Sequence, residues 1–413
     1  MRDLESGIDE YVTSGEQAVF GPDGRTVYAR SDAGEFPVLI RTLDGTAEVL
    51  AASDTAEVES FAVTATGGTA AVLWNRRGGM SELVVQDLVT GGHRLVSPLP
   101  GNVVSGLAWS ADGSTLTFTA EGPGQPHGTW TFDSSGLHPV SVHEPAPGAV
   151  RPILHRFASH DGLEISGWLF QPEPSDGAAG PFPTVLWFHG GPEAQERPGH
   201  GPLFQSLVDR GIAVFAPNVR GSSGFGRSFV NADNGSLRYA AIQDVKSCVD
   251  YLVEAGVTDP AKVGCMGRSY GGYLTLAALT TFPDMFAVGI DVCGMSNFAT
   301  FYEHTEPWIA SAAVSKYGDP VADRELLEDL SPITRIDRLR TPLLVVHGEN
   351  DSNVPVIEAE QVVKALAERG VEHRYLLFPD EGHELLHRSS RAEYLRETVE
   401  WLTGHLLTPA SVA

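Results

Sequence analysis

Residues 262–279 constrain the fold of this chain more than any other stretch. A short β-prone run leads into a Gly-x-Ser-x-Gly turn made by Gly267, Ser269 and Gly271, and an Ala- and Leu-rich helical pattern follows it. A strand, a sharp turn and a helix in this order are typical of a nucleophile elbow. A serine hydroxyl is a weak nucleophile, so the turn must hold it where a base and backbone amides can reach it. The stretch therefore predicts a nucleophile at Ser269.

Strand patterns alternate with helical patterns over residues 146–413, which we predict to form one domain that opens with a hairpin at 157–170. Strands are predicted at 184–188, 212–215, 263–266, 288–292, 343–346 and 374–378, and helices at 243–254, 356–369 and 391–407. Such alternation indicates a mostly parallel sheet with helices on both faces. We therefore predict an α/β domain with the α/β-hydrolase fold.

Residues 1–145 have the pattern of a separate all-β domain with an internal repeat. Turn glycines at Gly24, Gly68 and Gly113 recur 44 and 45 residues apart, each followed by strand-like alternation. A period in the forties with about four strands per unit is typical of β-propeller blades. We predict about three to four blades, with residues 1–16 contributing to a fourth; an ordinary antiparallel meander or sandwich is the alternative. An open array would cover its edge with a second copy, which predicts a homo-oligomer.

Charge and composition exclude several classes of partner. The chain has 53 acidic and 28 basic residues, a net charge of −25, which argues against nucleic acid or an anionic membrane. No run is long and apolar enough to span a membrane, and the first residues lack the apolar core of a signal peptide, so we expect a cytoplasmic protein. Cys248, Cys265 and Cys293 lack metal-ligand spacing; two of them lie in strand-like apolar runs and are interpreted as buried, which fits a reducing compartment. No metal ion and no cofactor are expected.

Two further loops at predicted strand ends supply partners for the serine. Asp351 follows the strand at 343–346, and His383 follows the strand at 374–378. Catalytic groups belong at the carboxyl ends of such strands, and the order Ser, Asp, His is that of α/β-hydrolases. We predict that Ser269 is the nucleophile, that His383 acts as base and then acid, and that Asp351 orients the imidazole.

Other side chains compete for two of these roles. Glu349, Asp380 and Glu381 are alternatives for the acid, and Glu349 is the strongest of them because it lies in the same loop as the predicted aspartate. His347 and His387 are alternatives for the base. The sequence leaves these alternatives open.

The oxyanion donors are expected at two turns. A His-Gly-Gly-Pro loop follows the strand at 184–188 directly, and its glycines allow backbone amides to point at a substrate oxygen. We predict that Gly191 supplies one amide and Tyr270, next to the nucleophile, the other. A plain Gly-Pro turn is the alternative interpretation. His189 of the same loop is a candidate substrate contact.

Residues 297–308 follow a predicted strand end and carry several aromatic side chains. Phe301 and Trp308 would line an apolar pocket, and Glu303 or Glu306 would bind an amine. The alternative is a helix that packs its aromatic side chains into the core.

Five motifs together resemble the prolyl oligopeptidase family of serine hydrolases, in particular its acylaminoacyl-peptidase and dipeptidyl-peptidase-like branch. They are Gly-Arg-Ser-Tyr-Gly-Gly around Ser269, the His-Gly-Gly-Pro loop, the Gly- and Ser-rich segment 218–226, Asn-Asp-Ser-Asn-Val-Pro around Asp351, and Glu-Gly-His ending at His383. The resemblance covers about residues 150–410. It implies an N-terminal propeller that filters substrates by size.

The chain departs from the family pattern in two ways. Family propellers usually have about seven or eight blades, and this chain has room for about half as many. Asn353 stands where some members carry an arginine. An arginine that binds a carboxylate or acyl carbonyl of the substrate is therefore not expected, and Asn353 itself is a candidate substrate contact. Arg220 is expected to bind an acid such as Asp244, with direct substrate contact as the alternative.

These patterns predict a metal-independent serine hydrolase that forms an acyl-enzyme. Its expected substrates are short peptides or acyl-aminoacyl compounds. One alternative is an esterase or thioesterase acting on small acyl substrates. A second alternative is a propeller-based binding protein without catalytic activity.

Overall fold

The computed structural model describes residues 13–145, 147–173 and 180–407. It divides into two compact units. One consists of the chain up to Ala149 with the short segments 197–200 and 223–228, and the other of 150–196, 201–222 and 229–413. Each unit is described separately below.

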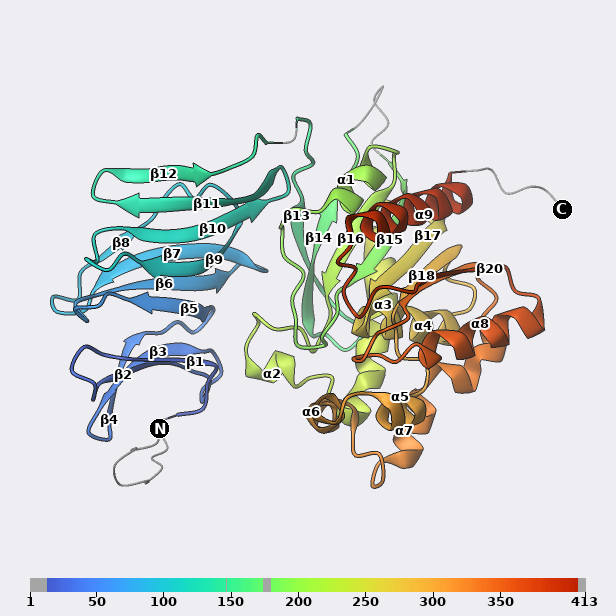
Figure 1. The fold of residues 1–413 in the computed structure, drawn as a ribbon. Helices are drawn as coiled ribbons and strands as arrows, with labels where there is room; N and C mark the ends of the chain where they lie inside the picture. Colours follow the sequence, from blue (N-terminus) through green and yellow to red (C-terminus); the bar gives the residue numbers. More distant parts are fainter. Residues whose placement is uncertain (1–12, 146, 174–179, 408–413) are drawn as a thin grey trace. The chain divides into compact units, whose positions relative to one another are not determined.

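The first unit contains three four-stranded antiparallel sheets, each formed by four consecutive strands (Figure 1). The first sheet consists of β1 (Gln17–Phe20), β2 (Val27–Ser31), β3 (Val38–Leu43) and β4 (Thr46–Ala51). The second consists of β5 (Glu57–Val63), β6 (Thr69–Arg76), β7 (Met80–Asp87) and β8 (His93–Leu95). The third consists of β9 (Val103–Trp109), β10 (Leu116–Gly122), β11 (Gln125–Asp133) and β12 (Gly136–Ser141). The predicted blade-like, all-β architecture is confirmed.

Strand β6 shows how these sheets pack. Successive side chains of a strand point to opposite faces, and here both faces are buried. Val72 and Trp74 join an apolar cluster with β2, β3 and β5. Ala71 and Leu73 join a second cluster with β9, β10 and β11. The middle sheet is therefore covered on both sides by its neighbours.

The repeated turn signal marks the hairpin between the first two strands of each sheet. Gly24 and Gly113 adopt left-handed φ angles of 67° and 71°, which glycine tolerates without steric cost. In the second sheet the left-handed position is Gly67, with φ 71°, one residue before the predicted glycine. Of residues 1–16, where part of a fourth blade was expected, the structure describes only 13–16, and they precede β1.

An eight-stranded sheet forms the centre of the second unit. Its order is β13-β14-β16-β15-β17-β18-β19-β20, with antiparallel pairing of β13, β14 and β16 and parallel pairing from β16 to β20. Its strands are β13 (Ile153–Ala158), β14 (Glu164–Phe170), β15 (Phe182–Phe188), β16 (Ala213–Asn218), β17 (Thr258–Arg268), β18 (Val288–Val292), β19 (Leu343–Gly348) and β20 (His373–Phe378). The predicted mostly parallel sheet and its opening hairpin are confirmed.

Helices cover both faces of this sheet (Figure 1). Helices α1 and α9 pack together on one face, and α3, α4 and α8 cover the other. The α-helices are α1 (Pro202–Val208), α2 (Arg227–Val230), α3 (Arg238–Glu254), α4 (Tyr270–Thr281), α5 (Phe298–His304), α6 (Pro307–Tyr317), α7 (Arg324–Leu330), α8 (Ile357–Arg369) and α9 (Arg388–Leu406). Two 3₁₀ helices, η1 (Gly235–Leu237) and η2 (Pro332–Arg338), complete the set in the described chain.

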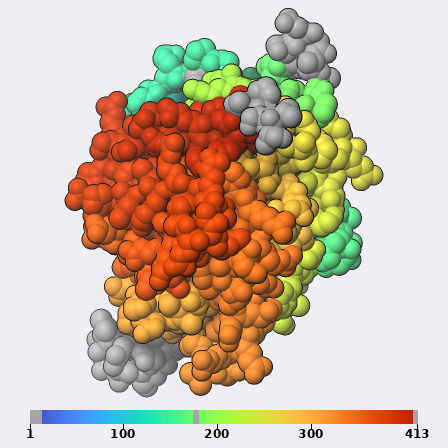
Figure 2. Space-filling model, turned by 90° about the vertical axis from the view of Figure 1, so that its right-hand side faces the viewer, coloured from blue at the N-terminus to red at the C-terminus, as the bar shows by residue number. Residues whose placement is uncertain are grey.

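The C-terminal part of the chain forms the surface at the β20 edge of this unit, coloured orange to red in Figure 2. The buried core lies between the sheet and its helices and includes residues of β15, β17, α3 and α4. Among the described residues, no helix has the length and apolar character needed to cross a membrane.

Two exposed glycines offer a matched test of helix geometry. Gly370 follows α8 with φ 65°, in the left-handed region, whereas Gly404 lies inside α9, and a Cβ would meet no atom within 4 Å at either position. We expect Gly370→Ala to lower the free energy of unfolding by about 1 kcal/mol, because alanine strains a left-handed cap. Gly404→Ala should raise it by about 0.5–1 kcal/mol. Urea unfolding measures both, and a change of the same sign in both variants would contradict the assigned geometries.

Candidate active site

Ser269 lies at the turn between β17 and α4. Its backbone has φ 57° and ψ −119°, which a residue with a side chain rarely adopts and which costs about 1–3 kcal/mol. The amide of Ser269 donates to the carbonyl of Val292 at 2.8 Å, so the turn is anchored to the end of β18. The serine is thus held in a strained conformation at the carboxyl end of the sheet.

Close backbone contacts explain the two glycines of the motif. A Cβ on Gly271 would lie 1.9 Å from the carbonyl oxygen of Phe188, and a Cβ on Gly267 would lie 2.4 Å from the carbonyl carbon of Gly271. Neither backbone atom can move as a flexible side chain could. The packing of α4 against β15 and β17 therefore requires glycine at both positions.

Asp351 and His383 form a hydrogen bond. The Nδ1 atom of His383 lies 2.8 Å from Oδ2 of Asp351. The other oxygen, Oδ1, accepts from the backbone amides of Asn353 and Val354, both at 2.9 Å. The carboxylate is buried and fixed by its own loop, so it holds the imidazole in one orientation.

The electrostatic surroundings favour a protonated imidazole. Burial lowers the pKa of His383, but its hydrogen bonds with Asp351 and Cys293 outweigh burial and raise the pKa above the ordinary value of 6.5. An imidazolium that forms when this histidine accepts a proton is therefore stabilised by the neighbouring carboxylate.

The alternative acids and bases have other positions or partners. Glu349 and Asp380 are exposed. Glu381 is buried, accepts from the amides of Leu386 and His387, and pairs with Nδ1 of His387 at 2.9 Å. The structure thus brings the predicted aspartate and histidine together, whereas Glu381 binds residues that follow His383.

A second histidine also lies near the carboxylate. Nε2 of His347 is 3.6 Å from Oδ2 of Asp351 but 2.8 Å from the carbonyl oxygen of Val354. The ring is buried, and burial lowers the pKa of His347. His347 thus binds the backbone of the Asp351 loop and does not line the cavity described below.

The two predicted oxyanion turns lie beside the serine. A Cβ on Gly190 would lie 3.4 Å from the Cβ of Ser269, so this loop passes directly over the nucleophile turn. Gly191 has φ 123°, and a Cβ there would lie 2.7 Å from the amide nitrogen of Glu193. Tyr270 is the first residue of α4, and the first amides of a helix have no acceptor within it. Both predicted oxyanion turns are therefore next to Ser269.

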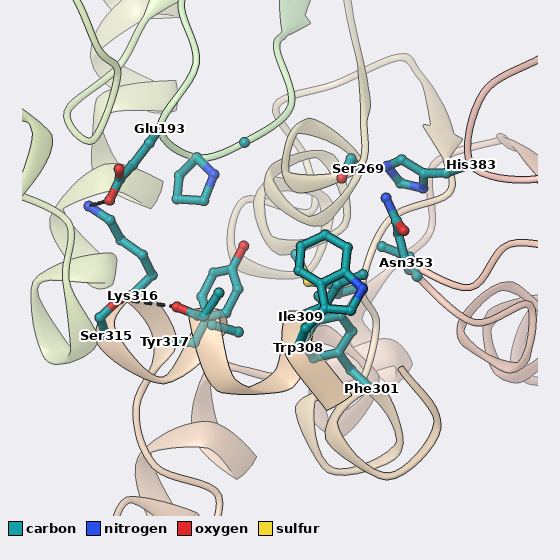
Figure 3. Close-up of a pocket in the computed structure, with 16 residues that line it drawn as sticks. Glu193, Ser269, Phe301, Trp308, Ile309, Ser315, Lys316, Tyr317, Asn353 and His383 are labelled. Atoms are coloured by element: carbon teal, nitrogen blue, oxygen red, sulfur yellow. Dashed lines mark hydrogen bonds and ion pairs between the residues drawn. The ribbon is translucent and has the colours of Figure 1, made fainter. Parts of the chain in front are cut away.

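A cavity of about 590 Å³ lies beside Ser269. Figure 3 shows Ser269 and His383 next to one another at one end, and Glu193 and Lys316 at the other. Most of its lining side chains are apolar. The lining residues are Gly191, Pro192, Glu193, Ser269, Met295, Phe301, Trp308, Ile309, Ala312, Ala313, Ser315, Lys316, Tyr317, Asn353, Val354 and His383.

Three of the predicted substrate contacts, Phe301, Trp308 and Asn353, line this cavity. The other four, His189, Arg220, Glu303 and Glu306, lie outside its lining.

Two of these four side chains already have hydrogen-bond partners within the protein. Nδ1 and Nε2 of His189 contact the Gly190 carbonyl and the Ser222 hydroxyl at 2.7 and 2.8 Å. Arg220 donates to Asp161 and, as predicted, to Asp244, with all four side-chain bonds at 2.8 or 2.9 Å. Arg220 therefore fixes its loop inside the protein.

The polar end of the cavity was not predicted. Nζ of Lys316 lies 2.6 Å from Oε1 of Glu193 and donates to the carbonyl of Val230 at 2.8 Å. The lysine side chain is only 8% exposed, whereas Glu193 is 53% exposed. The one sequence feature that pointed to this ion pair was Glu193, an acid two residues after Gly191. This ion pair connects the loop of Gly191 to α6.

Buried charges support the cavity wall beneath this pair. Arg238 forms an ion pair with Asp233, and its guanidinium lies 4.8 Å from the ring centre of Tyr270 and 5.0 Å from that of Tyr317. The same guanidinium donates to the Lys316 carbonyl at 3.1 Å. This cluster therefore links the residue after the nucleophile to α6.

Glu358 organises the loop that leads to Phe301. Its buried carboxylate accepts from the amides of Ser296 and Asn297 at 2.8 and 2.7 Å, and from Thr300. Burial raises the pKa of Glu358, and these hydrogen bonds oppose that effect. No sequence pattern indicated this role, because the glutamate lies on α8, about 60 residues after the amides that it binds.

One group of side chains has the composition of a metal site. Cys293, Asp351 and His383 each place one potential ligand atom within 4.8 Å of the other two.

The chain is similar in sequence to a known family and to curated proteins. The model of the prolyl oligopeptidase family matches residues 202–408, half of the chain. The chain is 41% identical over 236 residues to dipeptidyl aminopeptidase BIII of Pseudoxanthomonas mexicana, covering 55% of this chain and 34% of that protein. It is 29% identical over 309 residues to acylamino-acid-releasing enzyme 2 of Oryza sativa subsp. japonica, covering 69% and 39% respectively.

A solved structure has the same fold. It is a puromycin-hydrolyzing peptidase of Mycobacterium tuberculosis, with a TM-score of 0.86 and 23% identity over 94% of this chain and 61% of that chain. The present chain spans less than half the length of either curated relative. The family match, together with the nucleophile turn and the Asp351–His383 pair, leads to one conclusion: this chain belongs to the prolyl oligopeptidase family.

Proposed function

We propose that this chain is a serine hydrolase that cleaves short peptides or acyl-aminoacyl compounds through an acyl-enzyme. The observation that carries this proposal is the 2.8 Å hydrogen bond between His383 and Asp351, beside a serine held on a strained turn. Ser269 and His383 line the same cavity, so a substrate there would meet both. Ser269, His383 and Asp351 are the proposed nucleophile, base and orienting acid.

Acylation would begin when His383 accepts the proton of the Ser269 hydroxyl. The serine oxygen attacks the substrate carbonyl carbon, and the carbonyl oxygen becomes an oxyanion. The amides of Gly191 and Tyr270 would donate to that oxygen, which stabilises the charge where it develops. His383 then gives its proton to the leaving amine, and an acyl-serine ester remains.

Deacylation would use the same groups with water. His383 accepts a proton from a water molecule, which attacks the acyl ester, and the histidine returns the proton to Ser269. Asp351 remains ionised throughout and stabilises the imidazolium in both steps.

The cavity supports a substrate with an apolar group next to the scissile bond. Phe301, Trp308 and Ile309 offer apolar surface in the cavity on the side of Ser269 (Figure 3). The two curated relatives are named as an aminopeptidase and as an acylamino-acid-releasing enzyme, which supports peptide-like substrates. A cytoplasmic location and self-association through the β unit stay predictions from the sequence.

A fluorophosphonate probe and a substrate panel test this function. The probe should form an adduct on Ser269 in the folded chain, and its absence would remove the hydrolase proposal. The panel would contain aminoacyl p-nitroanilides, acyl-aminoacyl amides and p-nitrophenyl esters. Fast ester cleavage with amide cleavage near background would replace the peptidase proposal by an esterase.

Replacing the nucleophile should abolish turnover without unfolding the protein. We expect Ser269→Ala to lower kcat by on the order of 10⁴–10⁶-fold, because the covalent route is lost. Turnover and probe labelling measure the effect, and circular dichroism monitors the fold. Activity within tenfold of the unsubstituted chain would contradict the assignment of the nucleophile.

Removing the charge of the orienting acid should be nearly as damaging. Asp351→Asn should lower kcat by on the order of 10⁴-fold, because an amide favours the wrong imidazole tautomer. Glu349→Gln is the matched control in the same loop and should leave kcat almost unchanged, since Glu349 is exposed. If the two variants exchanged their effects, Glu349 would be the acid.

Filling the cavity should select against large substrates. Ala312 is exposed and lines the cavity, so a larger side chain there reduces its volume without disturbing the core. Ala312→Phe should lower kcat/KM by about tenfold for substrates with a large apolar group, with little effect on labelling by a small fluorophosphonate. Ser311→Phe, exposed on the same helix but outside the lining, is the control. Equal losses in both variants would place the substrate elsewhere.

A further inference from the structure

Cys293 occupies an unusual position beside the proposed triad. It directly follows β18 with φ 43°, an uncommon conformation for a residue with a side chain, and it is 3% exposed. Its amide donates to the carbonyl of Val346 at 2.8 Å, which fixes it at the end of the sheet. In the proposed hydrolysis this thiol contacts His383 but does not touch the reacting atoms.

The thiol belongs to a compact group of three potential ligands. One atom each from Cys293, His383 and Asp351 lies within 4.8 Å of the other two, and no other such group of three occurs in the described part of the chain. Thiolate, imidazole and carboxylate together form a donor set typical of zinc. The soft sulfur ligand also selects the heavier, thiophilic cation cadmium over magnesium or calcium.

We propose that Cys293, His383 and Asp351 form an inhibitory binding site for a thiophilic divalent cation of the zinc and cadmium class. On binding, the thiol of Cys293 releases its proton to solvent and becomes a thiolate ligand, and a protonated His383 likewise releases one proton to solvent and binds as a neutral imidazole. A nitrogen of His383 and an oxygen of Asp351 complete three protein ligands, and their mutual hydrogen bond is broken. A histidine used in this way can no longer act as the base for Ser269.

Charge and packing are compatible with such a site. A thiolate and a carboxylate neutralise a divalent cation, so the buried complex carries no net charge. Arg268, which also contacts the Cys293 thiol, has its charge balanced by Glu384 at 2.8 Å. Ligand atoms of a tetrahedral zinc site are separated by about 3.5 Å. The Nδ1–Oδ2 pair, 2.8 Å apart, must therefore widen, and a separation near the 4.8 Å limit must shorten by roughly 1 Å. Asp351 is held by two amides, so the ring of His383 and the thiol would make this adjustment.

The cavity provides a path for the ion. His383 lines it and has a side chain that is 18% exposed, whereas the side chain of Asp351 is fully buried. A cation would meet the imidazole first and reach the other two ligands by rotation of that ring. The fourth coordination position would then face the cavity and hold water, as in zinc sites with three protein ligands. Substrate in the cavity would compete with the ion for access.

The inhibitory effect rests on the proposed function, whereas binding of the ion does not. The test therefore measures the two separately on the full chain. Cadmium chloride is titrated while the cadmium–thiolate charge-transfer absorbance is recorded, and bound cadmium is counted after gel filtration. Zinc chloride is titrated against ester or amide turnover, with chelator added afterwards. We expect one cadmium ion per chain with the absorbance band, and reversible loss of turnover with zinc.

Three variants assign the site. Cys293→Ser retains the size of the side chain, and Cys293→Gly suits the left-handed backbone if serine prevents folding. Cys248→Ala removes another buried thiol, on α3, and is the matched control. Loss of the sulfur ligand should remove the absorbance band and weaken metal inhibition, measured relative to each variant's own metal-free turnover, by on the order of 100-fold.

Two results would overturn the proposal. One is a cadmium–thiolate band that survives in both Cys293 variants or disappears in Cys248→Ala. The other is zinc inhibition with the same midpoint in the unsubstituted chain and in the Cys293 variants. If the chain hydrolysed no substrate, the absorbance band and the cadmium count would still decide whether the site binds metal.

Discussion

The close approach of helix α4 to the strands beneath it determines the geometry of the site. Gly267 lies against the backbone of Gly271, and Gly271 lies against the backbone of Phe188. A Cβ at either glycine would come within 2.4 Å or less of a backbone atom. The helix is buried from Tyr270 to Thr280, and an apolar helix of this kind is stabilised by packing on all sides. Burial of about 25 cal/mol per Å² of apolar surface offsets the 1–3 kcal/mol of strain at Ser269. The strained serine is therefore a consequence of core packing.

Asp351 acts between two histidines, and its loop selects one of them. Its Oδ1 atom accepts from the amide of Val354, while the carbonyl of the same residue contacts His347 at 2.8 Å. His347 thus has a nearer partner than the carboxylate. His383 comes from a different loop and lines the cavity. The backbone of one short loop therefore decides which imidazole can serve a substrate.

The features that the sequence predicted are local in the chain. The nucleophile turn, the ends of β19 and β20 and the repeated hairpins each depend on a few consecutive residues, so glycine spacing and strand patterns indicated them. Helix α3 begins at Arg238 rather than at the predicted residue 243, because a buried arginine paired with Asp233 interrupts the apolar pattern. Sequence patterns treat such a charged residue as solvent-exposed.

The features that the sequence missed depend on contacts between distant segments. Lys316 meets Glu193 only after α6 has packed beside the loop that follows β15. Glu358 reaches the amides of Ser296 and Asn297 from α8. Neither pair has a characteristic spacing, since any acid or base of suitable reach satisfies it. Tertiary packing alone identifies these partners.

The strand register explains why a thiol lies beside the histidine. Arg268 pairs with Val292, and Val292 pairs with Val346, so β17 and β18 end level with Val346 of β19, which continues to Gly348. The next residues are Ser269 after β17, Cys293 after β18 and His347 within β19, and they lie side by side in this register. Their amides continue the ladder, because Ser269 donates to Val292 and Cys293 to Val346, both at 2.8 Å. Any side chain at position 293 is thereby placed near the nucleophile turn and the Asp351 loop. Its chemistry, and not its position, decides whether the triad also becomes a metal site.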